Sequence, residues 1–578
     1  MKLIDSLSDE QKELLNKNGK IVLRACPGSG KTYTVSAKLA DLISSWDSNI
    51  GGIATLSFTN VAWKEIDKNL TENEIYIKHP HFLGTIDSFI NRFIFLPFGH
   101  LVLNCKNRPQ LVGEPHSTWS DNTGRGHNFY RPHFDKFSFD INGGIKKFGF
   151  IQNPFKNSGY ADWNNFSKDN ALKMKNELLE KGYATQNDSN YFAMKILEEN
   201  EFIAKSLVKR FPYIIVDEAQ DTSDVQMRII DILIDNGLEN IILVGDHDQA
   251  IYEWNNAKPE LFNQKYEDWS ENSFILNVNR RSSQTICNHT YNLSSLESVS
   301  AVSSTELSEI RPIIEVCDPN CNNSLNQTID LFIDKCNEYN IDVNSNDVAI
   351  LTRSKSLIDI IKGISNTTIF IDIWNLNDSF SKDIIKGKYL IDNADFQKGF
   401  KTIKHAFIKK TLGIKTITKN NLKTFLDEKN LTLLELRIKI KNIVDKLPNT
   451  NNQKVTDFIR LANSSINNLN LASKNNDFKI EQLFKIEKST YKNCNIGTIH
   501  SVKGETYNAV LLFLRKSSAS GKHYKTMINN NISNLSEEEL RNVYVAITRP
   551  KQLLMIAVPD EDNKIAWNKK LRIYNEII

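Results

Sequence analysis

A glycine-rich segment near the start of the chain, Lys20–Thr32 (KIVLRACPGSGKT), leaves few folds open to it. The apolar run Ile21–Leu23 predicts a buried strand, and the residues from Lys31 to about Ile43 predict a helix directly after the glycines. A loop between a strand and a helix N-terminus is typical of phosphate binding, because its backbone amides and the helix dipole attract anions. The segment therefore predicts a nucleotide-binding α/β domain.

The loop carries side chains that suit ATP and a magnesium ion. Lys31 can reach the β- and γ-phosphates, and the Thr32 hydroxyl can bind Mg²⁺. The usual pattern opens with glycine six residues before the lysine, where this chain has Ala25, so the loop taken alone is an imperfect match. Upstream, Gln11 can pair with an adenine edge, although a plain surface glutamine is the alternative. We expect the nucleotide to be surrounded by Ala25, Cys26, Pro27, Gly28, Ser29, Gly30, Lys31 and Thr32.

Two acids end a second apolar segment, residues 211–221 (FPYIIVDEAQD). We interpret this segment as a buried parallel strand that faces the phosphate loop. Asp217 can then hold Mg²⁺ through water, and Glu218 can orient and deprotonate the water that attacks the γ-phosphate. A pair of solvated acids is the plainer alternative, but the upstream loop argues against it. Together the two segments predict ATP hydrolysis.

Polar and aromatic residues follow two further predicted strands. Residues 53–60 (IATLSFTN) and 82–89 (FLGTIDSF) each predict a strand that leads into a helix. Alternation of this kind predicts a parallel sheet, whose ligands gather at the carboxyl ends of the strands. Phe58, Thr59 and Asn60 lie at such an end.

Another strand end supplies candidates for sensing the nucleotide and for binding a nucleic acid. Gln249 follows the apolar run Ile241–Val244, where it can sense the γ-phosphate. Tyr252 and Trp254 come shortly afterwards. These aromatic side chains are either core residues or a platform on which single-stranded bases stack.

The composition is that of an ordinary globular protein with several domains. Of its 578 residues 40% are hydrophobic and 24% charged, and the net charge is only +3, so a bound nucleic acid requires a local basic groove. The seven cysteines form no CxxC pair, which argues against zinc and disulfides. Because neither a signal peptide nor a long apolar run is found, we expect a cytoplasmic protein without membrane contact.

Nine segments in order along the chain resemble the superfamily 1 DNA helicases of the UvrD, Rep and PcrA type, whose phosphate loop also opens with alanine. The segments that carry the resemblance are LSDEQ (7–11), ACPGSGKT (25–32), LSFTNVAWKEI (56–66), GTIDSF (84–89), VDEAQD (216–221), VGDHDQAIYEW (244–254), LNVNRRSS (276–283), GTIHSVKGETYNAVLL (497–512) and LRNVYVAITRPKQLL (540–554).

The resemblance implies two RecA-like P-loop domains with ATP in the cleft between them. Each domain would be α/β, with a parallel sheet flanked by helices, and would carry an inserted, mainly helical subdomain. The aperiodic, Asn- and Gly-rich stretch 104–165 fits the first insertion. The expected ranges are 1–100 and 207–275 for the first domain, 101–206 for its insertion, 276–374 and 489–578 for the second domain, and 375–488 for a reduced second insertion.

The resemblance also implies roles for individual residues. The expected catalytic set is Lys31, Glu218, Gln249, Arg281 and Arg549, in which the two arginines reach the phosphates from the second domain. Thr32 and Asp217 would hold Mg²⁺, and Gln11, Arg280, Gly504 and Thr506 would contact the nucleotide besides the loop. The residues expected to contact DNA are Phe58, Thr59, Asn60, Thr85, Tyr252, Trp254, Thr498 and His500.

Several positions depart from the family pattern. Asp87 stands where histidine is usual, and Arg280 stands where a tyrosine often stacks on adenine. Thr506 holds the position of a ribose-contacting glutamate, while Glu505 lies one residue earlier, so nucleotide selectivity is open. The Lys398–Lys454 stretch has 14 basic against 4 acidic residues; it is either a solvated surface or a face for duplex DNA or an acidic partner.

The short second insertion and the KGETYN variant most resemble the helicase-like GajB subunit of Gabija anti-phage systems. That resemblance implies a DNA-sensing ATPase subunit paired, in a hetero-oligomer, with a nuclease of the overcoming-lysogenization-defect (OLD) family type. The alternative is a stand-alone helicase or translocase that moves 3′ to 5′ on single-stranded DNA in repair or replication. DNA is the expected partner in both interpretations, and ATP with Mg²⁺ the expected cofactors.

Overall fold

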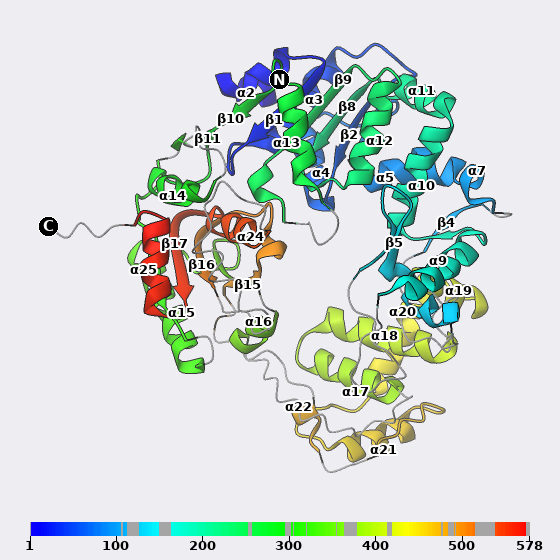
Figure 1. Cartoon of the computed structure of the whole chain (residues 1–578). Coiled ribbons are helices and arrows are strands. Elements are labelled where there is room, and N and C mark those ends of the chain that lie inside the picture. Colours follow the sequence, from blue (N-terminus) through cyan, green and yellow to red (C-terminus); the bar gives the residue numbers. More distant parts are fainter. Residues whose placement is uncertain are drawn as a thin grey trace.

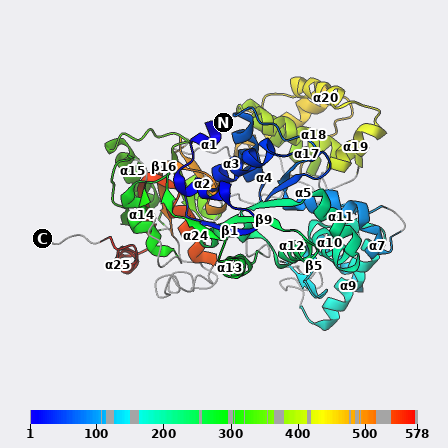
Figure 2. The same cartoon turned by 90° about the horizontal axis from the view of Figure 1, so that it is seen from above.

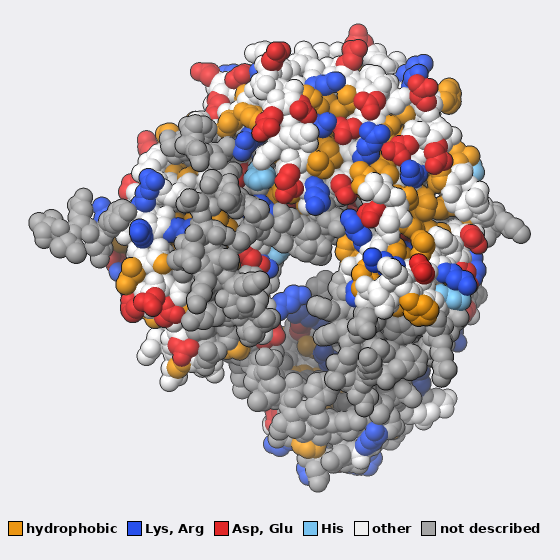
Figure 3. Space-filling model, viewed as in Figure 1, with side chains coloured by type: hydrophobic (Ala, Val, Ile, Leu, Met, Phe, Trp, Pro, Cys, Tyr) orange, Lys and Arg blue, Asp and Glu red, His pale blue; other side chains and the backbone are white. Residues whose placement is uncertain are grey.

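The computed structural model describes the chain apart from residues 1, 106–107, 113–125, 149–162, 252–256, 295–301, 304–305, 319–320, 354, 363–378, 413–418, 475–477, 484–490, 492, 515–537 and 574–578. Two lobes, each built on a parallel sheet with helices on its faces, carry two insertions (Figure 1). This is the predicted α/β architecture. With side chains drawn as spheres, an opening remains between the lobes and the insertions (Figure 3).

The first lobe contains a six-stranded sheet of order β10-β1-β9-β8-β2-β3, in which every pairing is parallel. Register places Ser57 beside Asp217 and Arg24 beside Gly245, so the carboxyl ends of four strands meet at one edge. The strands are β1 (Lys20–Ala25), β2 (Ile53–Ser57), β3 (Phe82–Thr85), β8 (Tyr213–Asp217), β9 (Asn240–Gly245) and β10 (Phe274–Leu276).

Helices cover both faces of this sheet, which explains why its strands read as continuous apolar runs. Alternate residues of one strand enter opposite cores: Ile214 and Val216 lie in one, and Tyr213 and Ile215 in the other. The helices of the first lobe are α1 (Lys2–Asp5), α2 (Asp9–Asn16), α3 (Lys31–Ser44), α4 (Asn60–Thr71), α5 (Ile86–Ile90), α6 (Leu96–Phe98), α7 (His100–Leu103), α12 (Asp224–Asp235) and α13 (Pro259–Asp268).

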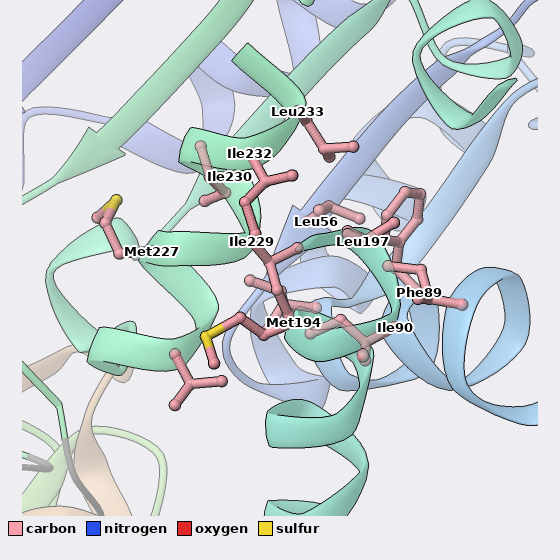
Figure 4. Packing of buried hydrophobic residues seen from close by; sticks show 14 of the residues in the cluster. Leu56, Phe89, Ile90, Met194, Leu197, Met227, Ile229, Ile230, Ile232 and Leu233 are labelled. Atoms are coloured by element: carbon pink, nitrogen blue, oxygen red, sulfur yellow. The ribbon is translucent and has the colours of Figure 1, made fainter. Parts of the chain in front are cut away.

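Two helices that the sequence assigned to the first insertion, α10 (Gln186–Glu199) and α11 (Glu201–Arg210), pack on the first lobe instead. Their apolar faces complete the core beside α5 and α12, because without them that side of the sheet would expose its apolar residues to water. Figure 4 shows this packing; the labelled side chains are Leu56, Phe89, Ile90, Met194, Leu197, Met227, Ile229, Ile230, Ile232 and Leu233. The predicted range 101–206 for the insertion therefore includes two helices whose apolar faces lie in the core of the first lobe.

The rest of the first insertion is a small body with its own core. It combines the helix α9 (Asn165–Leu179) with the antiparallel pair of β5 (Phe137–Phe139) and β6 (Ile145–Lys147). A second, parallel pair joins β4 (Gln110–Leu111) to β7 (Tyr183–Ala184). The core residues are Val112, Tyr130, Phe134, Phe137, Ala171, Met174 and Leu178.

The second lobe contains a five-stranded parallel sheet of order β13-β17-β16-β14-β15. Its strands are β13 (Ile313–Val316), β14 (Val348–Thr352), β15 (Asn495–Thr498), β16 (Tyr507–Phe513) and β17 (Pro550–Val558). A short pair of β11 (Val278–Asn279) and β12 (Val302–Ser303) lies next to the link between the lobes. The helices of the second lobe are α14 (Gln284–Thr290), α15 (Asn322–Glu338), α16 (Lys355–Ile361), α24 (Glu538–Ile547) and α25 (Glu561–Lys570).

The second insertion is helical and has a separate apolar core, and Figures 1 and 2 show its helices α17–α20 gathered apart from both sheets. The helices are α17 (Ser379–Asp392), α18 (Phe396–Leu412), α19 (Lys419–Glu428), α20 (Leu433–Lys446), α21 (Val455–Ser465) and α22 (Ile480–Leu483). Among the described residues, none of the helices has both the length and the apolar character that crossing a membrane requires.

Candidate functional site

A cavity of about 340 Å³ lies between the two lobes and is lined by residues of both. The first lobe contributes Cys26, Gly28, Ser29, Gly30, Lys31, Thr32, Tyr33, Thr59, Val61, Ala62, Glu65, Glu218 and Gln249. The second lobe contributes Arg281, His500, Ser501, Lys503, Gly504 and Arg549. The predicted catalytic residues Lys31, Glu218, Gln249, Arg281 and Arg549 therefore surround one space.

The glycine-rich loop adopts a conformation that its glycines permit. Gly28 and Gly30 have φ values of +79° and +81°, a region that favours glycine, and α3 begins at Lys31. A Cβ on Gly28 would lie 2.5 Å from Asn279 Oδ1 of the adjoining segment, so a larger residue would not fit. Ser29 is fully buried, and its hydroxyl has no hydrogen-bond partner among the described residues. An unsatisfied buried hydroxyl beside free helical amides suits a bound phosphate.

Oxygen donors lie together behind the loop. The Thr32 hydroxyl donates to Asp217 Oδ2 over 3.2 Å, and Asp217 is fully buried at the end of β8. Burial raises the pKa of Asp217, and the negative charge of Glu218 raises it further. A divalent cation would offset both effects. Hydroxyl and carboxylate oxygens are the ligands that Mg²⁺ prefers, so Thr32 and Asp217 fit the predicted ion.

The surroundings of Glu218 favour the ionised form of its carboxyl group. Burial by itself would raise its pKa, but the ammonium groups of Lys31 and Lys503 outweigh burial and hold the pKa below its usual value. Gln220 Nε2 donates to Glu218 Oε2 over 2.5 Å and fixes its orientation. The backbone of Glu218 has a φ of 55°, which is rare for a residue with a side chain and is typical of functional positions.

Two arginines of the second lobe reach the cavity. Arg549, only 1% exposed, donates from Nη2 to Gln249 Oε1 over 2.7 Å, and Arg281 donates from Nη1 to the carbonyl of Thr548 over 3.1 Å. Burial and the charge of Arg281 lower the pKa of Arg549 to about 9. Two guanidinium groups at one buried place favour a highly charged anion there.

A chain of hydrogen bonds joins Glu218 to Arg549. Gln220 donates to Glu218 and accepts from the backbone N–H of Asp246 over 3.1 Å. Gln249 Nε2 donates to Asp246 Oδ2 over 2.5 Å, and its oxygen accepts from Arg549. A change at the acid can therefore be transmitted to the second lobe through two glutamines.

Lys503, which was not predicted as a site residue, forms a second connection between the lobes. Its ammonium group pairs with the buried carboxylate of Asp221 and donates to the carbonyl of Gln249 over 2.9 Å. Burial raises the pKa of Asp221 to about 6, although Lys503 opposes the rise. Lys503 belongs to the KGETYN segment and Asp221 to the VDEAQD segment. Membership in these motifs was the only sequence feature that could have marked the two residues as part of the site.

Two residues that were expected to contact the nucleotide besides the loop, Gln11 and Arg280, both bind the backbone of the glycine-rich loop. Gln11 Nε2 donates to the Ser29 carbonyl over 3.0 Å. Arg280 donates from Nη1 to the same carbonyl over 3.2 Å and from Nη2 to Ser8 Oγ over 2.7 Å. Tyr33, also missed from sequence, lines the cavity and shares a hydrogen bond of 2.6 Å with Ser6.

The other predicted nucleotide contacts have different placements. Ala25 is buried at the end of β1, and the Pro27 carbonyl accepts from the Tyr291 hydroxyl over 2.7 Å, so both residues shape the loop. Gly504 lines the cavity with a φ of +91°. Thr506 is half-buried and is not among the lining residues.

Three of the predicted DNA contacts act as helix caps. Thr59, Thr85 and Thr498 each accept a backbone N–H with their hydroxyl, over 3.2, 3.1 and 3.3 Å. Asn60 Oδ1 accepts from the indole of Trp63 over 3.1 Å. These side chains therefore hold the strand ends in shape, whether or not they also contact DNA.

The remaining DNA candidates differ in placement. His500 lines the nucleotide cavity rather than a separate surface, and burial together with Arg353 lowers its pKa, so it is neutral near pH 7. Phe58 lines a second groove of about 210 Å³ beside the first insertion. Tyr252 and Trp254 lie outside the described residues.

Comparison with known proteins adds independent matches. The model of the UvrD/REP helicase N-terminal domain matches residues 7–117 and 146–270, and that of the UvrD-like helicase C-terminal domain matches residues 393–561. Together they cover most of the chain.

Three relatives illustrate the similarity. A probable DNA helicase II homolog of Mycoplasma capricolum is 26% identical over 49% of this chain and 40% of its own length. The ATP-dependent DNA helicase Rep of Buchnera aphidicola is 27% identical over 99% of this chain and 83% of its own length. An ATP-dependent helicase/nuclease subunit of Streptococcus pyogenes is 38% identical over 18% of this chain and 8% of its own length. The match to the first relative thus spans less than half of that protein.

Proposed function

The chain belongs to the UvrD/Rep-type helicase family, and from this premise we propose that it hydrolyses ATP between its lobes in order to translocate on DNA and separate strands. The observation that carries the proposal is the shared cavity: Lys31 and Glu218 of the first lobe lie with Arg281 and Arg549 of the second. A cavity built from both lobes couples the state of the nucleotide to the distance between them.

In the proposed reaction the glycine-rich loop holds the phosphates, and Lys31 neutralises the terminal ones. Glu218 orients a water molecule and accepts its proton as the water oxygen bonds to the γ-phosphorus. The bond from that phosphorus to the bridging oxygen breaks, giving ADP and phosphate. When bound at Thr32 and Asp217, Mg²⁺ supplies positive charge to the phosphates.

The second lobe supplies the rest of the charge stabilisation. Arg281 and Arg549 face the equatorial oxygens, where negative charge accumulates during transfer. Loss of the γ-phosphate removes the anion that both guanidinium groups need. The bridge from Glu218 through Gln220 and Gln249 to Arg549 then favours a different spacing of the lobes, and a DNA strand lying across both is shifted.

The proposal is tested by two assays on the intact chain. ATP hydrolysis is measured with and without single-stranded DNA, and strand displacement is measured on duplexes with a 3′ tail and with a 5′ tail. We expect DNA to stimulate hydrolysis, and the 3′-tailed duplex to be the better substrate. Hydrolysis that DNA does not change would contradict coupling; strong hydrolysis without displacement of either duplex would leave a translocase that does not unwind.

The narrower interpretation, an ATPase subunit of an anti-phage system with a nuclease partner, stays a prediction from sequence resemblance. The relatives described above carry helicase names, and the two broader matches are Rep and a helicase II homolog, which favours the stand-alone interpretation. Co-purification with the product of a neighbouring nuclease gene, sized by light scattering, distinguishes the two. A chain that stays monomeric beside that product supports the stand-alone helicase.

Lys503→Met is expected to weaken the coupling between the lobes. The change removes the cation that pairs with buried Asp221 and the bond to Gln249, both of which cross the cavity. Truncating one member of a buried charged pair costs roughly 2–5 kcal/mol. We therefore expect a higher KM for ATP and weaker stimulation by DNA.

The double variant Lys503→Met/Asp221→Asn serves as the control for Lys503→Met. Because it leaves no unpaired carboxylate, it should regain the thermal stability that the single variant loses. It should not regain stimulation by DNA. Full stimulation in the single variant would show that this connection carries no coupling.

A further inference from the structure

A second groove lies where the first lobe meets its insertion, and it shares no lining residue with the nucleotide cavity. Its volume is about 210 Å³. The walls come from the end of β2, from α5, from the β5–β6 pair and from the N-terminal turns of α10 and α12. The lining residues are Phe58, Asp87, Ser138, Phe139, Lys146, Asn187, Asn190, Ser223, Asp224, Val225 and Gln226.

Asp87 presents an acceptor to this groove. Its Oδ1 accepts from Asn190 Nδ2 over 3.1 Å and from Gln226 Nε2 over 3.0 Å. Its Oδ2 makes no hydrogen bond to the residues that the structure describes. Burial raises the pKa of Asp87, and the two amide donors only partly oppose this. The half-buried carboxyl group thus has two neutral donors on one oxygen only.

Ser138 supplies a second unsatisfied group. Its side chain is 1% exposed and lines the groove, and its Oγ has no hydrogen-bond partner among the described residues. A buried hydroxyl left without a partner costs free energy, so such groups in native proteins usually meet a ligand or water. Across the β5–β6 pair, Ser138 lies opposite Lys146.

Flat apolar surface and charge decide what the groove can hold. Phe58 and Phe139 supply aromatic rings, and Phe139 is held by stacking on Tyr191 with 4.9 Å between ring centroids. Two carboxylates, Asp87 and Asp224, outnumber the single ammonium group of Lys146 among the lining residues. The groove therefore disfavours a phosphate and suits an uncharged planar group that carries hydrogen-bond donors.

We propose that this groove holds one base of the bound DNA strand, and that Asp87 selects bases with an exocyclic amino group, cytosine and adenine, over thymine. The amino group of cytosine or adenine donates to the free oxygen of Asp87, whereas thymine offers a carbonyl at that position. The Phe rings support the base, and the ammonium group of Lys146 supplies positive charge for the adjoining backbone phosphate. The inference rests on the proposed function, because it requires DNA on this lobe.

The test compares single-stranded oligonucleotides of one length that contain only deoxycytidine, thymidine or deoxyuridine. Deoxyuridine separates the effect of the thymine methyl group from that of the exocyclic oxygen. Affinity for the full chain is measured by fluorescence anisotropy, and the half-saturating concentration is measured in the ATPase assay. A charge-assisted hydrogen bond corresponds to about tenfold in affinity, so the deoxycytidine strand should bind about tenfold tighter than both others.

Asp87→Asn should reverse this preference. Asn190 and Gln226 both donate to Oδ1, so they hold the new amide with its carbonyl oxygen at that position. The amide NH₂ then faces the groove and donates to the exocyclic oxygen of thymine or uracil. Ser138→Ala should weaken binding of every strand while the deoxycytidine preference persists. This second variant tests whether the groove binds DNA even if Asp87→Asn folds poorly.

Asp224→Asn is the matched control, because it removes the same charge from the same groove. It should strengthen binding of all strands alike and leave the preference for deoxycytidine. Equal affinities in the unmodified chain, or loss of the preference in Asp224→Asn, would overturn base selection by Asp87. Absence of DNA binding altogether would instead contradict the proposed function.

Discussion

Arg549→Ala is expected to lower kcat for DNA-stimulated ATP hydrolysis by about 10³-fold or more. The guanidinium group is buried in the cavity and donates to Gln249, and its pKa is already lowered to about 9 by burial and by Arg281. Such a group gains most when an anion forms beside it, because the charge is otherwise poorly compensated. Stabilisation that arises mainly in the transition state appears in kcat rather than in KM.

Arg549→Lys distinguishes charge from geometry. Lysine keeps a positive charge but cannot donate to Gln249 and to a phosphate oxygen at once through a rigid fork. We expect it to recover only a small part of the rate. Circular dichroism and thermal unfolding check that the buried substitution leaves the fold intact, and anisotropy checks DNA affinity. A variant that folds, binds DNA and hydrolyses ATP at an undiminished rate would remove Arg549 from the reaction.

The parts of the site that the sequence could predict are those whose chemistry is local. The phosphate loop and the Asp217–Glu218 pair each lie within a few consecutive residues, after a short apolar run that predicts a buried strand and forms one. The residue types of the loop indicate phosphate binding, and those of the acid pair indicate metal binding and activation of water. Arg281 and Arg549 carry no such local signature, and only the family resemblance linked them to the nucleotide.

Contacts between distant segments explain what the sequence missed. Lys503 bonds to Asp221 and to Gln249, which are 282 and 254 residues away, so its role exists only once the lobes meet. His500 was expected at the DNA, but the same meeting of lobes puts it in the nucleotide cavity. The packing of α10 on the first lobe was likewise not predicted, because apolar periodicity shows that a helix is buried but not which domain it packs against.

Departures from a family pattern have physical consequences that a sequence can flag and a structure can specify. Asp87 was visible as an acid in place of a histidine, but nothing in the sequence showed that Asn190 and Gln226 would occupy one of its oxygens. The free oxygen, and with it the proposed base selection, depends on α10 belonging to the first lobe. The packing of α10 on the first lobe therefore changes the interpretation of Asp87, which lies 99 positions before α10 begins at Gln186.

Glu218→Gln is expected to lower kcat by about 10²–10⁴-fold while leaving ATP affinity nearly unchanged. The amide has the size of the carboxylate, and Gln220 can still donate to its oxygen, so the cavity keeps its shape. What is lost is the base: an amide cannot take the proton of the attacking water. Because Lys31 and Lys503 hold the pKa of Glu218 below its usual value, the unmodified enzyme should not lose activity through this group between pH 6 and 8.

Glu65→Gln is the matched control for Glu218→Gln, since Glu65 is a second carboxylate in the same cavity but is not positioned by Gln220. It removes one negative charge without touching the proposed base, so its rate should stay close to that of the unmodified chain. Single-turnover hydrolysis with saturating DNA separates the chemical step from product release. If both variants slow that step equally, the loss reflects the charge of the cavity; if neither does, the proton of the attacking water is taken by another group.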